Sequence, residues 1–183
     1  GSVQGLLAED RDELDKDRAD TAVFYSISNC QDGLAGISFG NSLIKQVVAD
    51  LSQEVPNLKT FVTLSPIPDL RTWLARNDID LPEDEGARRE VAARYLLHAK
   101  RADGTPFDPV ARFHLGNGAL VHAVHAGADL SPNGQRQSGG VMVNYLYDLS
   151  QISQNYERFA AAGEIAASPE VTALAAAAAR MPE

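Results

Sequence analysis

The sequence predicts an α/β domain, and three observations carry this prediction. A chain of 183 residues is long enough for one domain with a hydrophobic core and too short for two ordinary ones. Its hydrophobic fraction of 44% and charged fraction of 22% are typical of a globular protein. Residues 23–64 have the pattern strand, glycine-containing loop, helix, strand, which predicts a right-handed βαβ unit with two nearly parallel strands.

The first strand is expected over residues 23–28, which are rich in β-branched and aromatic side chains. A loop with three glycines follows over residues 31–40. Residues 41–54 place apolar side chains at helical spacing, and Pro56 ends this helix.

The second strand is expected over residues 60–64, and it runs into Ser65-Pro66-Ile67-Pro68. Two prolines around one residue predict a stiff turn there. A short helix has Asp108 as its N-cap, Pro109 as its first residue and Gly116 as its closing glycine. Further helices are expected over residues 69–76, 85–99, 153–162 and 168–180, and a third strand over residues 141–147.

Residues 9–18 contain a single apolar residue and cannot bury a face. We therefore expect a charged, solvated lead-in over residues 1–22 and the folded domain over residues 23–183. The net charge of −9 argues against nucleic acid and anionic membranes as partners, because both require clustered Lys and Arg. No apolar stretch approaches the roughly 20 residues of a membrane span, and the single Cys30 fits a reducing cytosol.

Three segments hold candidates for chemistry. The glycine loop can cradle a phosphate at a helix N-terminus, or it is an ordinary flexible connection. Ser65 follows a strand, where ligands collect in open α/β sheets, but for an arbitrary Ser-Pro a turn serine that bonds its own backbone is the more common case. His114 has the side chain best tuned for proton transfer near neutral pH, although a lone histidine on such a helix is usually structural.

Other polar residues are less specific. His122 and His125 can share a metal on a helix, but no third ligand stands beside them, so we interpret both as structural. Asn144 and Tyr145 are adjacent in the expected third strand and face opposite sides of it, with Tyr147 on the side of Tyr145. These side chains can hydrogen-bond a thioester oxygen or line the core.

Taken together, five segments resemble the C-terminal catalytic domain of malonyl-CoA decarboxylase, a divergent branch of the GNAT acetyltransferase superfamily. They occur in the order of the family, and two of them carry Leu-Ser-Pro-Ile-Pro around Ser65 and Phe-His-Leu-Gly-Asn-Gly around His114. The segments are residues 23–28, 33–48, 64–68, 111–119 and 138–145.

The resemblance implies a GNAT-like mixed sheet flanked by helices, without its first strands and without the family's N-terminal helical domain. We therefore expect a piece of a longer chain. It also implies decarboxylation of malonyl-CoA to acetyl-CoA and CO₂ through a thioester enolate. In that reaction Ser65 contacts the malonyl group, His114 donates the proton, and Asn144 and Tyr145 are possible substrate contacts. The residues implied to bind the CoA pyrophosphate are Ala35, Gly36, Ile37, Ser38, Phe39, Gly40 and Asn41.

Malonyl-CoA is the implied partner, and no metal or redox cofactor is expected. A homo-oligomer is expected, in the cytoplasm of a bacterium or, in a eukaryote, in mitochondria or peroxisomes. Two alternatives remain open at this point: a GNAT-type acyltransferase that transfers the acyl group to an amine, and a CoA-binding domain without catalysis.

Overall fold

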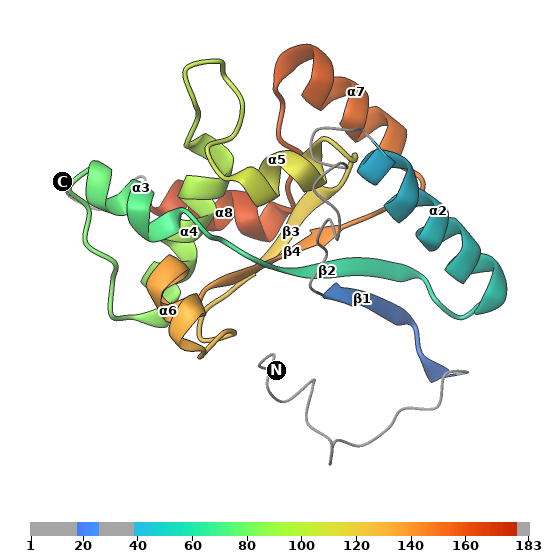
Figure 1. Cartoon of the computed structure of the whole chain (residues 1–183), viewed down its shortest axis with the longest axis horizontal. Coiled ribbons are helices and arrows are strands. Elements are labelled where there is room, and N and C mark those ends of the chain that lie inside the picture. Colours follow the sequence, from blue (N-terminus) through green and yellow to red (C-terminus); the bar gives the residue numbers. More distant parts are fainter. Residues whose placement is uncertain (1–17, 26–38, 179–183) are drawn as a thin grey trace.

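The computed structural model describes residues 18–25 and 39–178 and contains one mixed β-sheet (Figure 1). The strand order is β1-β2-β4-β3, with β1 parallel to β2 and the other neighbours antiparallel. The strands are β1 (Thr21–Tyr25), β2 (Thr60–Pro66), β3 (Leu120–His125) and β4 (Met142–Leu146). The helices are α2 (Phe39–Glu54), α3 (Leu70–Arg76), α4 (Glu85–His98), α5 (Pro109–Leu115), α6 (Pro132–Ser138), α7 (Ile152–Ala162) and α8 (Pro169–Ala178).

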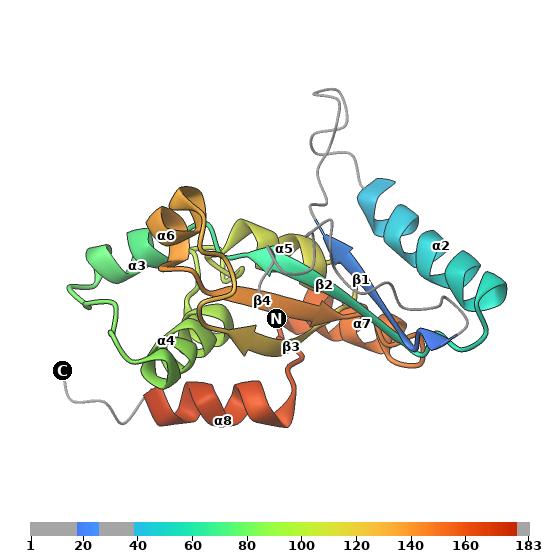
Figure 2. The same cartoon turned by 90° about the horizontal axis from the view of Figure 1, so that it is seen from below.

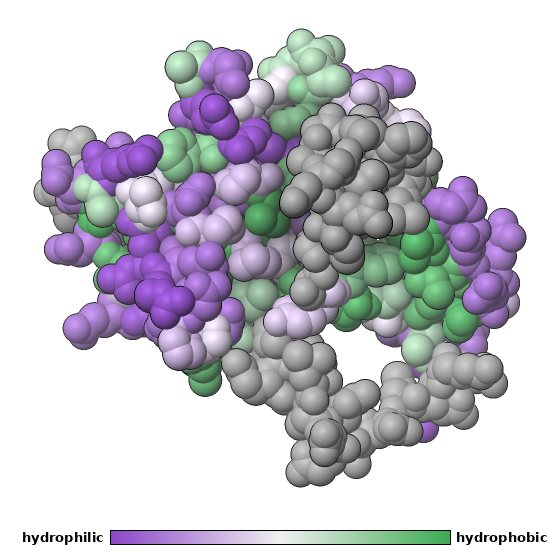
Figure 3. Space-filling model, viewed as in Figure 1, coloured by the Kyte–Doolittle hydropathy of each residue, from purple (hydrophilic) through white to green (hydrophobic). Residues whose placement is uncertain are grey.

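The helices lie at different ends of the sheet. Figures 1 and 2 show α2 at the end that holds β1, while α4 and α8 pack against each other and against β3. Ile44 and Val48 of α2 are buried in the main core. In Figure 3 the side of α2 turned to the sheet is hydrophobic and its outer side is hydrophilic. Among the described residues, no helix is long and apolar enough to cross a membrane.

The two faces of the sheet differ in burial. Because side chains alternate along a strand, Phe61, Thr63 and Ser65 of β2 share one face, which we call the core face. The strand register places Val143 and Tyr145 of β4 on the same face, and all five side chains are buried. The opposite face is more exposed at β1, where Val23 and Tyr25 keep 49% and 46% of their surface accessible.

The predicted βαβ unit is confirmed, since β1 and β2 pair in parallel from Thr21↔Thr60 to Tyr25↔Leu64. Its first strand begins two residues earlier than expected, and the expected strand residues 26–28 lie outside the described residues. The helix begins at Phe39, so Phe39 and Gly40 belong to α2, not to the loop.

The predicted turn at Ser65-Pro66 is wrong. Strand β2 continues through both residues, which pair with Val143 and Met142 of β4. A proline is tolerated there because it is the last residue of the strand, beyond the point where the described part of β1 pairs with β2.

Two elements were absent from the sequence prediction. The stretch with His122 and His125 is strand β3, whose ladder with β4 is irregular between Val121 and Ala123. Residues 132–138 form α6, which Ser131 caps through its side chain and Gly139 closes in a left-handed conformation.

The short helix α5 has the expected beginning but a different end. Gly116 is right-handed, with φ −64°, and the left-handed glycine is Gly118, with φ 81°. The chain turns at Gly118 in this left-handed conformation. A side chain is excluded there, because a Cβ would lie 2.2 Å from the carbonyl oxygen of Ile152. The other expected helices are present as α3, α4, α7 and α8. Their ends lie within one residue of the predictions, apart from the end of α8, where the expected residues 179–180 lie outside the described residues.

Candidate active site

The centre of the candidate site is a contact between Ser65 and His114, which lie 49 residues apart in the sequence. Strand β2 brings Ser65 to the core face, and helix α5 lays His114 over that face. The Ser65 Oγ and the His114 Nε2 are 3.2 Å apart. Both residues are buried, with 5% and 2% of their surface exposed. A hydroxyl and an imidazole at this distance can exchange a proton.

Helix α5 presents His114 because its first turn is fixed by a buried cap. The Asp108 carboxylate accepts from the backbone N–H groups of Val110 and Ala111, each at 2.9 Å. The Tyr95 hydroxyl donates to the same carboxylate at 3.3 Å. Burial raises the pKa of Asp108 to about 6, against the opposing effect of these hydrogen bonds. The cap therefore holds the short helix that ends next to Ser65 and His114, which we call the reactive pair.

The imidazole of His114 is held on three sides. Its Nδ1 lies 2.8 Å from the Tyr147 hydroxyl, and its Nε2 faces Ser65. The ring of Tyr145 stacks on it, with 4.4 Å between centroids and 22° between planes. Burial lowers the pKa of His114 to about 3, so the ring is neutral at neutral pH. One ring nitrogen then carries a hydrogen and the other accepts one.

Asn144 lies on the opposite side of the sheet from this pair. Its amide donates to the backbone carbonyl of Thr63, and its side-chain oxygen contacts the Nε2 of His125. The structure therefore brings Tyr145 to the reactive pair and separates Asn144 from it. Tyr145 is fully buried, and its hydroxyl has no hydrogen-bond partner among the described residues.

The segment predicted to bind the CoA pyrophosphate is described only in part. Ala35, Gly36, Ile37 and Ser38 lie outside the described residues. Phe39, Gly40 and Asn41 begin the 16-residue helix α2. The backbone N–H groups in a helix's first turn, such as these, are free of intrahelical bonds and favour anions.

The described residues contain no cluster of three His, Cys, Asp or Glu that could hold a metal ion. His122 and His125 lie on a strand, and His125 contacts Asn144 instead of a second histidine.

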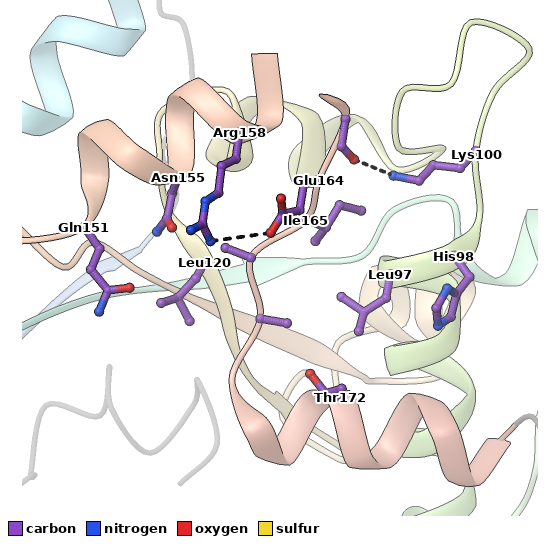
Figure 4. Close-up of a pocket in the computed structure, with 13 residues that line it drawn as sticks. Leu97, His98, Lys100, Leu120, Gln151, Asn155, Arg158, Glu164, Ile165 and Thr172 are labelled. Carbon is purple, nitrogen blue, oxygen red and sulfur yellow. Dashed lines mark hydrogen bonds and ion pairs between the residues drawn. The ribbon is translucent and has the colours of Figure 1, made fainter. Parts of the chain in front are cut away.

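A separate cavity lies between α4, α7 and α8 (Figure 4). It has a volume of about 520 Å³, and neither Ser65 nor His114 lines it. Two of its basic side chains already have partners: Arg158 pairs with Glu164, and Lys100 donates to the carbonyl of Gly163. We call it the α4–α7–α8 pocket.

One neighbour of the reactive pair was missing from the sequence prediction. The Thr63 Oγ1 lies 2.9 Å from the Ser65 Oγ. The signal that could have found it is spacing, since residues two apart in a strand share a face.

Comparison with known proteins identifies the family. The chain matches the family described as Malonyl-CoA decarboxylase C-terminal domain over residues 1–87 and 82–182, which together span nearly all of it. The chain belongs to this family. The predicted family is therefore confirmed.

Relatives of the malonyl-CoA decarboxylase family extend this result. The crystal structure of malonyl-CoA decarboxylase from Rhodopseudomonas palustris matches with a TM-score of 0.86 and 44% identity over 94% of this chain. Mitochondrial malonyl-CoA decarboxylase from Rattus norvegicus is 33% identical over 222 aligned residues and 96% of this chain. The chain spans 46% of the first protein and 45% of the second, about half of each.

A more distant structure supports the fold alone. The loading GNATL domain of CurA from Lyngbya majuscula matches with a TM-score of 0.50 and 17% identity, over 72% of this chain and 56% of that one. The predicted GNAT-like mixed sheet flanked by helices is confirmed.

Proposed function

We propose that this protein decarboxylates malonyl-CoA to acetyl-CoA and CO₂. The observation that carries the proposal is the buried contact between Ser65 and His114, in a chain that belongs to the malonyl-CoA decarboxylase family. The relatives named above are malonyl-CoA decarboxylases, which supports malonyl-CoA as the substrate.

The proposed reaction breaks one bond and makes one. The bond between the α-carbon and the carboxylate breaks, CO₂ leaves, and the electron pair moves onto the thioester as an enolate. A proton then joins the α-carbon, so the reaction consumes one proton for each CO₂. The protein must stabilise the developing oxyanion and supply that proton, and removal of one oxyanion donor typically costs about 3–4 kcal/mol of barrier. This chemistry requires no metal or redox cofactor.

His114 is the proposed proton donor, and its burial shapes how it acts. In the free protein the ring is neutral because burial lowers its pKa to about 3. A malonyl carboxylate bound beside Ser65 would raise that pKa, since an opposite charge within about 4–6 Å favours the charged imidazole. His114 then takes up a proton when substrate binds and delivers it to the α-carbon after CO₂ departs.

Ser65 is the proposed contact to the malonyl group. Its hydroxyl lies 3.2 Å from the His114 Nε2, so it can bond the carboxylate or relay the proton. Tyr145 orients the imidazole by stacking, and Asn144 acts through the strand because its amide is engaged on the opposite face. Residues 35–41 would hold the CoA pyrophosphate, because the backbone N–H groups at the start of a long helix such as α2 favour anions.

The proposal includes a cytoplasmic bacterial enzyme of malonate or fatty-acid metabolism, which acts as a homo-oligomer. Identity is higher to the Rhodopseudomonas palustris protein, at 44%, than to the rat protein, at 33%, which supports the bacterial assignment.

The test is to incubate the purified protein with malonyl-CoA alone and to measure acetyl-CoA and CO₂. The proposal predicts equal amounts of both without any acceptor, and loss of both in a Ser65→Ala variant. Acyl transfer that needs an added amine would show an acyltransferase. CoA-dependent thermal stabilisation without turnover would show a binding domain.

A further inference from the structure

The ladder between β2 and β4 is interrupted next to the reactive pair. The pairs Val62↔Leu146 and Ser65↔Val143 keep one register, which places Thr63 opposite Tyr145, but Thr63 and Leu64 between them form no regular ladder pairs. Side chains fill the interruption, because the amide of Asn144 donates to the Thr63 carbonyl and the backbone N–H of Tyr145 donates to the Thr63 Oγ1 at 3.2 Å. The Thr63 hydroxyl thus replaces a backbone acceptor.

The hydrogen bonds of Thr63 indicate which hydroxyl is the donor in its contact with Ser65. A threonine hydroxyl has one hydrogen and two lone pairs, and the Tyr145 N–H occupies one lone pair. The other polar neighbour is the Ser65 Oγ at 2.9 Å. The heavy-atom geometry has Ser65 as the donor to Thr63, but both groups are hydroxyls, so the hydrogen between them can belong to either oxygen. If Ser65 donated, the Thr63 hydrogen would have no partner among the described residues, at a side chain with 0% exposure. Buried polar groups are rarely left unpaired, so Thr63 is the donor.

We propose that Thr63 is a positioning residue of the proposed decarboxylation, whose hydroxyl donates to Ser65 and thereby directs the Ser65 hydrogen to the His114 Nε2. His114 then carries its own hydrogen on Nδ1 and donates it to the Tyr147 hydroxyl, 2.8 Å away. One threonine hydroxyl therefore fixes both the Ser65 rotamer and the His114 tautomer. Thr63 is fully buried in the free protein, so it acts through Ser65.

The first test compares kcat and KM for malonyl-CoA in three variants of the protein. Thr63→Val removes the hydroxyl at nearly constant shape, Thr63→Ser keeps it, and Thr60→Val is a matched control on the same strand. We expect Thr63→Val to lower kcat about tenfold, the value of one hydrogen bond, with KM within twofold of wild type. Thr63→Ser and Thr60→Val should resemble wild type. A wild-type kcat in Thr63→Val, or a Thr63→Ser variant as slow as Thr63→Val, would overturn the proposal.

A second test separates positioning from a general effect on the strand. In a Ser65→Ala background, Thr63→Val should cause no further loss of kcat, because the group that it positions is gone. A further tenfold loss in that background would show that Thr63 acts by another route. If Thr63→Val does not fold, Thr63→Ala replaces it in both tests.

The inference rests on the proposed function, and one measurement distinguishes their failures. The ¹⁵N chemical shifts of the His114 imidazole report its tautomer without any turnover. We expect the hydrogen on Nδ1 in wild type and in Thr60→Val, and a shift towards the other tautomer in Thr63→Val. An unchanged tautomer in Thr63→Val overturns the positioning role, whereas absence of acetyl-CoA in wild type overturns only the decarboxylation.

Discussion

The reactive pair and the α4–α7–α8 pocket are opposite kinds of environment within one domain. Ser65 and His114 are buried and bond to hydroxyl groups, and burial lowers the pKa of the histidine to about 3. The pocket, of about 520 Å³, is lined by charged side chains, but its Arg158 and Glu164 remain 54% and 57% exposed (Figure 4). Water screens such charges, so their interaction is weak. Desolvation therefore shifts the protonation of His114, whereas the charged groups of the pocket stay close to solvent.

The largest expected effect separates two histidines. His114→Asn removes the proposed proton donor and should lower kcat for acetyl-CoA formation by about 10²- to 10⁴-fold. The matched control is His98→Asn, which changes an exposed histidine that lines the pocket. Its kcat should equal that of wild type, and equal losses in the two variants would remove the distinction between the two regions.

The pH dependence of the free energy of unfolding should differ between wild type and His114→Asn. The folded pKa of His114, about 3, lies below its ordinary value of 6.5. The folded state therefore binds fewer protons there than the unfolded state. The contribution of the neutral His114 to the free energy of unfolding is therefore complete above pH 6.5 and is lost as the pH falls towards 3. The loss should be on the order of 4 kcal/mol. Urea unfolding of wild type and His114→Asn across this range measures it, and parallel curves would contradict the neutral buried ring.

Gly118 connects the two regions, because it follows α5 and contacts Ile152 at the start of α7. Gly118→Ala puts a Cβ in a left-handed position and 2.2 Å from a backbone oxygen. Gly104→Ala is the control, since Gly104 has a similar φ of 79° and no neighbour within 4 Å of a Cβ. We expect a cost of about 1–2 kcal/mol from conformation in both, and about 1–3 kcal/mol more at Gly118 from overpacking. Equal losses in the free energy of unfolding of Gly118→Ala and Gly104→Ala would show that the Ile152 carbonyl moves away from the new Cβ without measurable cost.

The smallest effect is expected in the pocket. Arg158→Gln breaks an ion pair whose atoms lie 3.6 Å apart at the surface. The free energy of unfolding should change by less than about 1 kcal/mol, and kcat should not change. A tenfold loss of activity would make the pocket part of the working site.

The sequence singled out Ser65 and His114 through two ordered motifs, and the structure places these two residues in contact. The sequence could not predict the hydrogen bonds that surround them. Periodicity alone was enough for the βαβ unit and for most helices, because their apolar spacing and caps are local signals. Strand β3 was missed because His122 and His125 interrupt its apolar pattern, although pairing with β4 tolerates them at a partly exposed face. Likewise, Ser65 was expected in a turn, since the pairing that extends β2 through Pro66 is set by a strand nearly 80 residues away.

The role of Thr63 shows the same limit. Its spacing from Ser65 places it on the same face, but the hydrogen bonds of its hydroxyl and its carbonyl depend on Tyr145 and Asn144, which are distant in the sequence. Such a network exists only in the folded chain. The pyrophosphate-binding residues 35–38 stay a prediction, because they lie outside the described residues.

The most direct test of the central claim is whether Ser65 and His114 act as one unit. We would measure kcat for acetyl-CoA formation in Ser65→Ala, His114→Asn and the double variant, with His98→Asn as the control. If the pair works together, the double variant should be no slower than the slower single variant, because either change already disables the unit. Losses that multiply in the double variant would contradict the account, since they would show that the two residues contribute independently.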